Sequence, residues 1–583
     1  MILQALVRCY DALAKAGRLE KPGWSPVKVS LALELDENGA LLRALPLGET
    51  GEKGKRRPPK LNVPAPVKRS SGVASNFLCD NAIYILGMDS KGRPERTAQC
   101  YAACREKHEA LLSNVDHPMA RAIVRFFESW DPAAAGENPA LAPYMDELAQ
   151  GANLVFCMDS EFAQDVPALR QAWDDAYGAD ETAARGRCLV TGEEAPIALL
   201  HPSIKGVMGA NPTGASLVSF NARAYESYGR DEAQGLNAPV GERAAFAYGA
   251  ALNYLLSDRT YNTRLGETTL VYWAEGAEEG YNFAMSCMLG LEDNLMRQEQ
   301  LKGVMEALCG GRTAYWDDIP LNPDNRYYIL GLAPNSARLS VRFFLQNSFG
   351  GFAEKLNRHQ EELRIVRPSG DLRETLPVWA LLRETANPNS RDKNPPGQLV
   401  GETMRAILTG APYPASLFTQ VQMRIRAEHE INRGKAAIIK AWLLRNIAAK
   451  RPEHVYKEVL RVKLNDETTY QPYLLGRLFA VLEGLQQAAN PGINTTIRDR
   501  YFNSACATPA MVFPTLVKLA QAHLNKLDTG LRIHYEKMIT ELYGAMEESL
   551  PAHMALQDQG VFQLGYYQQK QKLYTKKEEK NNV

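Results

Sequence analysis

The stretch Pro64-Ala-Pro-Val-Lys-Arg-Ser-Ser-Gly-Val-Ala-Ser-Asn-Phe-Leu-Cys-Asp-Asn-Ala-Ile-Tyr-Ile-Leu-Gly87 joins a basic, proline-broken loop to an apolar run. Between Lys53 and Cys79 there are seven lysines and arginines and no acidic residue, so this segment is not part of a buried core. Its small polar residues let a backbone approach a ligand and hydrogen-bond it. The pattern predicts a loop that faces nucleic acid, docked on a strand over residues 82–88. A solvated loop between two strands is the alternative.

Length and composition indicate a soluble globular protein of two to four domains. The chain has 583 residues, 45% hydrophobic and 23% charged, and no apolar run approaches the ~20 residues of a membrane-spanning helix. The first ten residues resemble a short amphipathic helix more than a signal peptide. We therefore expect a cytoplasmic protein.

The cysteines do not form a disulfide framework, because there are nine of them, scattered along the chain. Cys100, Cys104 and His108 would share one face of a helix, but they lack a fourth ligand and the close pairing of zinc cysteines. We expect no metal and no cofactor.

Charge is informative only in its distribution, since 67 basic residues balance 67 acidic ones. Besides the loop at residues 53–69, a second basic feature lies in residues 412–450, with only Glu428 and Glu430 against seven cations. These cations are Arg424, Arg426, Arg433, Lys435, Lys440, Arg445 and Lys450. Basic helices of this kind suit binding to nucleic acid.

The N-terminal half shows the patterns of an α+β protein with mixed and antiparallel sheets. Alternating apolar residues over 27–35, a turn and a second apolar run at 41–45 predict a β-hairpin. Further strands are expected at 154–158, 268–274, 327–332 and 338–344, and helices at 96–112, 120–130, 166–177 and 242–256. We place an N-terminal α/β region with the basic loop at residues 1–150 and a second β-rich region at 151–350.

Beyond residue 350 the chain reads as helical almost without interruption. Helices are expected at 351–365, 376–386, 397–409, 412–432 and 434–450, which form a helical region at residues 351–461. Apolar residues spaced by three and four from Leu475 onward predict a C-terminal helical bundle at residues 462–583. Its last residues, 572–583, are charged and expected to fray.

No familiar catalytic motif is present in the sequence. There is no zinc-binding His-Glu-x-x-His, no Gly-x-Ser-x-Gly elbow, no Walker loop and no kinase set. Two acidic pairs beside tryptophan would suit a metal-dependent nuclease, namely Asp174 with Asp175 and Asp317 with Asp318. Two-metal sites need more carboxylates from elsewhere, so turn or helix-end carboxylates are the better interpretation.

A second candidate loop lies at residues 205–221. Its glycines permit close approach of a sugar-phosphate chain, while the Gly-x4-Gly-Lys-Ser/Thr pattern of nucleotide hydrolases is absent. Donors and acceptors are supplied by Lys205, Asn211, Thr213, Ser216 and Asn221. A glycine-rich turn between strands is the alternative.

Several motifs lie in order along nearly the whole chain. They include Val67-Lys-Arg-Ser-Ser-Gly, Asn76-Phe-Leu-Cys-Asp-Asn, Cys188-Leu-Val-Thr-Gly, Ser219-Phe-Asn, Ala250-Ala-Leu-Asn, Ile329-Leu-Gly-Leu-Ala-Pro-Asn and Asp499-Arg-Tyr-Phe. Together these motifs resemble the large subunit of the CRISPR type I-C Cascade surveillance complex. The resemblance implies a non-catalytic subunit of an RNA-guided complex. Such a subunit recognises the protospacer-adjacent motif in duplex DNA, aids duplex opening and R-loop formation, and presents the displaced strand to a separate helicase-nuclease.

The resemblance also implies partners, while the candidate binding residues are chosen by the chemistry of their side chains. Expected partners are double-stranded and displaced single-stranded DNA, the backbone subunits that carry the guide RNA, the helicase-nuclease, and small-subunit copies made from an internal start near Val462. Candidates for motif recognition are Lys68, Arg69, Ser70, Ser71 and Asn76, with the loop at 205–221 as a second wall. Candidates for the displaced strand are Arg498, Arg500, Lys518 and Lys526. A metal-dependent nuclease that uses the aspartate pairs is the second hypothesis.

Overall fold

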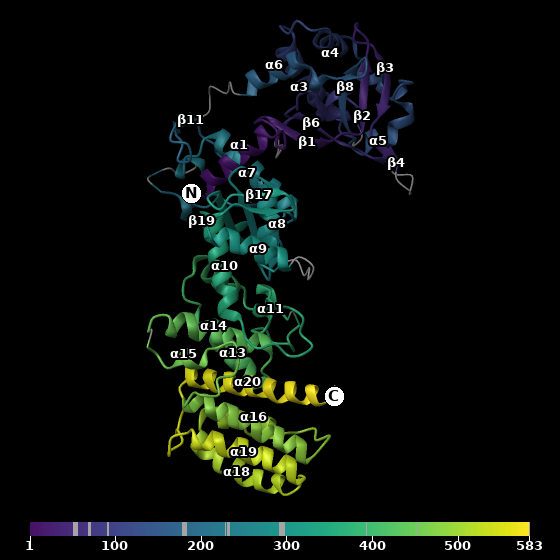
Figure 1. The fold of residues 1–583 in the computed structure, drawn as a ribbon. Helices are drawn as coiled ribbons and strands as arrows, with labels where there is room; N and C mark the ends of the chain where they lie inside the picture. The colour runs from purple at the N-terminus through teal and green to yellow at the C-terminus, as the bar shows by residue number, and fades with distance from the viewer. Residues whose placement is uncertain are drawn as a thin grey trace. The chain divides into compact units, whose positions relative to one another are not determined.

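The structure is a computed structural model that describes residues 1–50, 56–67, 72–89, 92–177, 184–227, 229, 234–290, 298–391, 393–451 and 453–581. The chain forms two compact units, shown with their elements in Figure 1. We call residues 10–200 and 220–250 the N-terminal unit, and residues 1–9, 201–219 and 251–583 the C-terminal unit. With 50% helix and 16% strand, the predicted α+β class with a helical C-terminal half is confirmed.

A five-stranded mixed sheet organises the N-terminal unit. Its order is β3-β2-β8-β7, with β9 also paired to β8. The predicted hairpin is present as antiparallel β2 (Leu31–Leu35) and β3 (Leu41–Pro46), and β2 also pairs in parallel with β8 (Asn153–Met158). Every residue of β2 is buried, because helices cover one face of the sheet and the β1–β6 pair covers the other. The remaining strands are β1 (Trp24–Lys28), β4 (Glu49–Thr50), β5 (Arg56–Arg57), β6 (Lys60–Pro64), β7 (Cys79–Asn81) and β9 (Glu161–Phe162).

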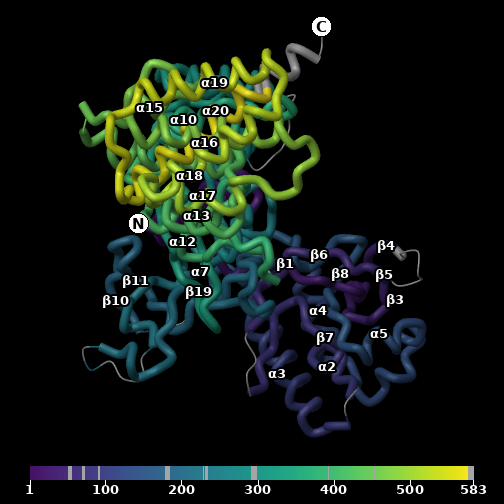
Figure 2. The backbone as a smooth tube through the Cα atoms, turned by 90° about the horizontal axis from the view of Figure 1, so that it is seen from below, coloured from purple at the N-terminus to yellow at the C-terminus, as the bar shows by residue number. Residues whose placement is uncertain are grey.

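The predicted strand over residues 82–88 is wrong. The strand here is only β7, and the apolar run that follows it forms a short helix, α2 (Ala82–Ile85). Asn81 explains the change, since its side chain accepts a hydrogen bond from the backbone N–H of Ile83 at 3.1 Å and caps the helix. Figure 2 shows β7 and α2 beside α3 (Pro94–Leu112).

Helices complete the N-terminal unit close to the predicted positions. An aromatic core under the sheet joins Phe126 and Phe127 to Phe156 on β8. Eight of the nine cysteines in the chain are buried, as is usual for core residues. The helices are α1 (Ile2–Lys15, which begins in the C-terminal unit), α3, α4 (Pro118–Ser129), α5 (Met145–Ala149), α6 (Pro167–Tyr177) and α7 (Glu242–Ser257, which ends in the C-terminal unit); the strands β10 (Arg185–Arg187) and β11 (Glu194–Pro196) form a small hairpin.

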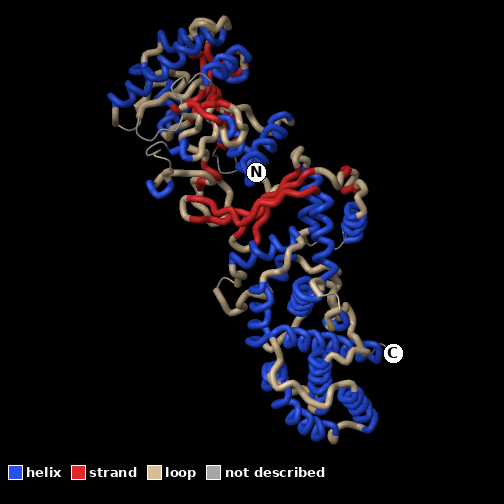
Figure 3. Tube along the Cα trace, turned by 90° about the vertical axis from the view of Figure 1, so that its left-hand side faces the viewer, coloured by secondary structure: helices blue, strands red, loops and turns tan. Residues whose placement is uncertain are grey.

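A six-stranded sheet with the order β12-β13-β19-β18-β15-β14 opens the C-terminal unit. Its centre is the long antiparallel pair β18 (Arg326–Asn335) and β19 (Arg338–Ser348), beside the fully buried β15 (Thr268–Ala274). Figure 3 shows this sheet in red with helices against it. The other elements of this part are β12 (Ser203–Ile204), β13 (Ala215–Ser216), β14 (Asn262–Leu265), α8 (Glu279–Met288), α9 (Gln298–Cys309), β16 (Ala314–Trp316) and β17 (Ile319–Leu321).

The rest of the C-terminal unit is helical and shares one continuous hydrophobic core, which runs from Leu265 to Tyr567. Both predicted boundaries at residues 350 and 461 lie inside this unit. Its helices are α10 (Phe349–Leu363), α11 (Val378–Arg383), α12 (Gly397–Thr409), α13 (Ala415–Glu428), α14 (Arg433–Leu443) with a π-helical turn at Leu444–Ala448, α15 (Tyr456–Val459), α16 (Gln471–Ala489), α17 (Ile497–Ala507), α18 (Pro509–Leu524), α19 (Thr529–Gly544) and α20 (Leu556–Asn581).

Helix α20 is the central element of the predicted bundle, and it extends to Asn581, into the charged segment 572–583 that was expected to fray. It passes between α14 and α16 (Figure 1), and Phe562 and Tyr566 on it are buried. Glycines allow the close crossing of α16 and α20, because a Cβ on Gly476 would lie 1.9 Å from the carbonyl oxygen of Phe562. A Cβ on Gly565 would lie 2.3 Å from the carbonyl oxygen of Tyr473. Small residues at a crossing bring two backbones into direct contact.

Candidate nucleic-acid interface

Asn76 closes the base of the basic loop. Four of the candidate residues, Lys68, Arg69, Ser70 and Ser71, lie outside the described residues. The Asn76 side-chain oxygen accepts a hydrogen bond from the backbone N–H of Val67 at 3.0 Å. Its own backbone N–H donates to the buried Asp80 carboxylate at 3.0 Å. The described contacts of Asn76 therefore fix where the two ends of the loop lie.

Helix α3 anchors the same segment from below. The backbone N–H of Leu78 donates to Nε2 of the buried His108 at 3.0 Å, and Nδ1 of the ring lies 2.7 Å from the carbonyl oxygen of Cys104. Burial lowers the pKa of His108 to about 4, so the ring is neutral and Nδ1 carries the proton. Lys107 Nζ donates to the carbonyl oxygen of Ser75 at 3.0 Å.

These contacts give the cysteine and histidine cluster on α3 a structural role. Both ring nitrogens of His108 are engaged with backbone groups, so neither is available as a metal ligand in this conformation. Within the described residues, no group of three or more histidine, cysteine or acidic side chains is placed to hold a metal ion.

The first part of the second candidate loop, residues 205–214, connects β12 to β13 and is held by residues that were not among the candidates; Ser216 lies on β13 and Asn221 follows it. Asn253 on α7 accepts the backbone N–H of Lys205 at 2.8 Å and donates to the carbonyl oxygen of Ser203 at 3.1 Å. The backbone N–H of Met208 donates to Oγ1 of the buried Thr269 at 3.3 Å. The sequence signal for Asn253 was a polar residue inside an apolar helix, within the quoted Ala250-Ala-Leu-Asn motif.

The side chains of this loop are presented to solvent. Lys205, Asn211, Thr213 and Asn221 are exposed, and Ser216 is half-buried where β13 pairs with β19. The Asn211 side-chain oxygen accepts from the backbone N–H and the hydroxyl of Thr213, at 3.1 and 2.9 Å. This local turn keeps Asn211 and Thr213 together.

The glycines of the loop are required by its backbone. Gly206, Gly209 and Gly214 have φ values of +89°, +80° and +109°. These values are strained for residues that carry a Cβ. A Cβ on Gly214 would also lie 2.8 Å from that of Ser203. The fixed shape brings Lys205 and the 211–213 turn onto one short segment, anchored beneath by α7 and β15.

Of the seven cations counted in residues 412–450, four are buried, whereas Arg426 and Lys450 are exposed and Arg424 is half-buried. The side chains of Arg433, Lys435, Lys440 and Arg445 are buried and bind acidic groups or carbonyl oxygens of the same unit. Arg445 contacts the carboxylate of Glu362 at 2.7 Å with a side chain that is only 1% exposed. These four cations serve the core and its ion pairs, and cannot reach a phosphate without leaving them.

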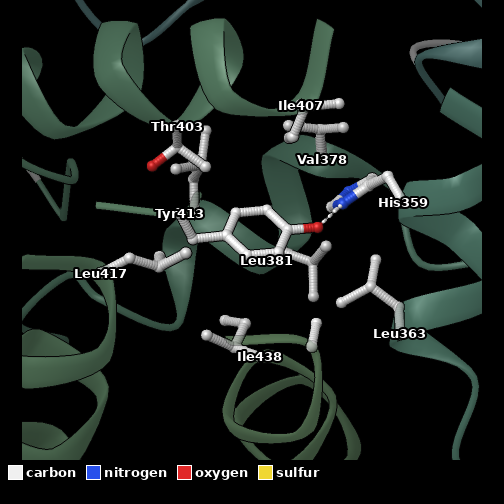
Figure 4. A pocket seen from close by; sticks show the side chains of 11 residues that line it. His359, Leu363, Val378, Leu381, Thr403, Ile407, Tyr413, Leu417 and Ile438 are labelled. Atoms are coloured by element: carbon white, nitrogen blue, oxygen red, sulfur yellow. Dashed lines mark hydrogen bonds between the residues drawn. The ribbon is translucent and has the colours of Figure 1, made fainter. Parts of the chain in front are cut away.

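A small cavity lies beside this network of buried charges, lined by His359 and Tyr413 among others. It has a volume of about 20 Å³, room for about one water molecule. Figure 4 shows Tyr413 crossing the cavity with its hydroxyl 2.6 Å from Nδ1 of His359. Burial lowers the pKa of His359 to about 3, so this ring is neutral. The cavity is far too small for a nucleotide or a base.

The four candidates for the displaced strand differ in their surroundings. Arg500 and Lys518 are exposed, and Lys526 is exposed with Nζ donating to the Asn490 side chain at 2.8 Å. Arg498 is partly buried, 3.8 Å from the buried carboxylate of Glu483. Arg498 thus helps to neutralise a buried charge in the bundle, whereas the other three present their charge at its surface.

Both aspartate pairs have local structural partners. Asp174 accepts the indole N–H of Trp24 at 2.7 Å, and Asp175 accepts from the side chain of Gln171 at 2.7 Å. Asp317 and Asp318, with φ of +45° and +68°, form the two-residue turn between β16 and β17. Two successive residues with positive φ are typical of a hairpin turn that favours Asp, Asn and Gly. Their placement matches the turn interpretation from sequence.

A comparison with protein families matches residues 6–574 to the family described as CRISPR-associated protein (Cas_Csd1). The chain belongs to this family. Membership over nearly the whole chain confirms the resemblance to a Csd-type large subunit, and it implies a role and partners in a Cascade complex. A search of curated proteins found none that matches the chain. Among the described helices, none combines the length and apolar character needed to cross a membrane.

Proposed function

We propose that this chain is the non-catalytic, DNA-binding large subunit of a type I-C surveillance complex. In this role it recognises the protospacer-adjacent motif in duplex DNA, aids duplex opening, and recruits the helicase-nuclease. The observation that carries the proposal is the 203–216 loop, an anchored segment that offers a cation, an amide and a hydroxyl to solvent. Arg and Lys suit phosphate or guanine acceptors, and Asn and Thr reach base edges.

Guide-RNA pairing explains why so few contacts suffice. Base pairing with the guide reads the long target sequence, so the protein reads only a short duplex motif and holds backbones. Zero net charge is compatible with this role, because cations are needed only where DNA passes. The base of the 68–75 loop, fixed by Asn76 and α3, is the second element that we assign to motif recognition.

The direct test replaces Lys205 and Asn211 together with alanine. We expect weaker binding of a duplex that carries the motif, by ~1 to 3 kcal/mol for each lost base contact, and a salt slope lower by about one for a lost phosphate contact. Fluorescence anisotropy over a salt series measures both. Lys15→Ala with Asn38→Ala is the matched control, since both residues are exposed and lie outside the two loops. Equal affinity and equal motif preference for the two double variants would refute the assignment.

The proposal that the subunit is non-catalytic has its own test. Purified protein is incubated with labelled duplex and Mg²⁺, and we expect no cleavage. Cleavage that is lost in Asp174→Asn or Asp317→Asn would instead establish the nuclease alternative.

We also propose that a small subunit is made from an internal, non-AUG start near Val462. Met423 lies inside α13, and Met511 would discard α16 and α17, so neither methionine is well placed. A product of residues 462–583 keeps the α16–α20 crossing intact. It also contains Arg500, Lys518 and Lys526, which would bind the backbone of a displaced strand.

A synonymous change of the Val462 codon to one that cannot initiate should abolish the short C-terminal band of the purified complex. Persistence of the band would show that the start lies elsewhere. Absence of any such band from the unmutated complex would refute the idea of an internal product.

A further inference from the structure

A line of cations in the C-terminal unit continues from the 203–216 loop along β19. Strand β13 carries the end of the loop and pairs with β19 through Ser216 and Arg338. Four residues further along β19, about 13 Å at the usual rise per residue, lies the exposed Arg342. Every step of this path lies within one compact unit.

Arg342 meets helix α12 at a glycine. A Cβ on Gly401 would lie 3.6 Å from the Cβ of Arg342, so the arginine stem covers this position of the helix. One turn later on the same helix face is the exposed Arg405. Among the residues that the structure describes, the guanidinium groups of Arg342 and Arg405 make no hydrogen bond or ion pair. Both charges are therefore available to an outside ligand.

The line continues past the end of α12. Gly410 ends this helix with φ of +72°, and a Cβ there would lie 3.1 Å from Lys355 and 3.9 Å from Arg358 of α10. These two cations have acidic partners, Lys355 with Glu354 at 3.0 Å and Arg358 with the buried Glu362 at 2.9 Å. They add positive charge at the end of the line but are less available than the two arginines.

The acidic side chains near the line include Glu402, Glu354 beside Lys355, and Glu267, whose carboxylate lies against Gly397 at the start of α12. Glu402 is exposed on the same stripe of α12, where Gln398 donates to it at 2.9 Å. The charge of Glu362 is already neutralised by Arg445. The line thus presents two unpaired arginines, and Arg405 lies one helical turn beyond the glycine that Arg342 covers, a step that suits neighbouring phosphates of a nucleic-acid strand.

We propose that Arg342 and Arg405 form a backbone-binding track for single-stranded DNA, continuous with the loop at Lys205. The strand that leaves the recognised duplex would run along β19 and the exposed stripe of α12. The two arginines bind phosphates and read no sequence. This proposal rests on the proposed DNA-binding function and adds a route for one strand that the sequence patterns did not indicate.

The test uses a double variant that carries both Arg342→Ala and Arg405→Ala. Its binding to a labelled single-stranded oligonucleotide is compared with that of wild type. We expect affinity to fall about tenfold at low salt, and the slope of log K against log salt to fall by about 1.4, or ~0.7 for each lost phosphate contact. The matched control is Arg105→Ala with Arg121→Ala, which removes two exposed arginines held in surface ion pairs with Glu109 and Asp116. The control should keep the wild-type slope.

The outcomes separate this proposal from the function on which it rests. An unchanged slope in the Arg342 and Arg405 variant, while Lys205→Ala with Asn211→Ala still weakens binding of the motif duplex, would overturn the track alone. A wild-type chain that binds neither the motif duplex nor the single strand would overturn the proposed function and the track together. An equal fall in the control variant would show a general charge effect and would also overturn the track.

Discussion

The crossing of α16 and α20 predicts that Gly476→Ala is strongly destabilising. A Cβ at this position would lie 1.9 Å from the backbone oxygen of Phe562, and real Cβ contacts stay beyond 3.0 Å, so the helices must separate by about 1 Å. Such a gap forfeits a quarter to a half of each dispersion contact across it. Overpacking usually costs 1–3 kcal/mol, and we expect about 3 kcal/mol here because backbone, not a flexible side chain, must move.

Gly303→Ala is the matched control for this prediction. Gly303 is exposed on α9, and a Cβ there meets nothing within 4 Å, so helix propensity alone should raise stability by about 0.5–1 kcal/mol. Urea unfolding followed by circular dichroism gives the midpoint of the C-terminal unit for each variant. The two midpoints should move in opposite directions. A Gly476→Ala protein that is as stable as Gly303→Ala would refute the close backbone crossing.

Three further predictions concern buried titratable or charged groups. Wild type should lose about 2 kcal/mol of unfolding free energy between pH 7.5 and 5, because the unfolded His108 ring takes up a proton below pH 6.5 and the folded ring only near pH 4; His108→Gln should not show this loss. An equal loss of unfolding free energy in the two proteins, measured by urea unfolding at both pH values, would contradict this. Glu362→Gln leaves the Arg445 guanidinium buried without its carboxylate and should cost about 3–5 kcal/mol, which Arg445→Met in the same chain should largely restore in thermal unfolding. Burial lowers the pKa of Lys440 to about 8, so the unfolded state binds more protons between pH 8 and 10.5 and stability should rise across that window; Lys440→Met should abolish the rise in a pH series of melts.

Sequence patterns predicted most regular elements because their apolar spacing was clear. The β2–β3 hairpin, the buried strand β15 and the helix over residues 397–409 all lie where the patterns placed them. The run after Asn81 was predicted as a strand because Ile, Tyr and Leu are common in strands. The signal for a helix is the single capping residue Asn81, which is weaker than the pattern of the whole run. Helix α20 was missed because glutamines and glycines interrupt its apolar residues, and its burial comes from neighbours on both sides.

In the candidate site, too, one part could be predicted from the sequence and another part could not. The glycine spacing correctly indicated a constrained loop at Gly206, Gly209 and Gly214, because positive φ is a local requirement. Its anchors, Asn253 and Thr269, come from a distant helix and strand, which no local pattern reveals.

Counting charges along the chain overestimates the positive charge that the basic helices present, because burial decides what a cation can bind. In the densest basic segment, residues 412–450, the buried side chains of Arg433 and Lys440 bind the carboxylate of Asp371 and the carbonyl oxygen of Glu362. Arg342 and Arg405 stand alone in the sequence, yet the packing of β19 against α12 brings them close together, and neither guanidinium is paired with a described residue. Phosphate binding requires the exposed, unpaired kind of cation, since a buried ion pair would have to break first. If the proposed DNA-binding function holds, Arg342 and Arg405 are more available to a phosphate than the four buried cations of the basic helices.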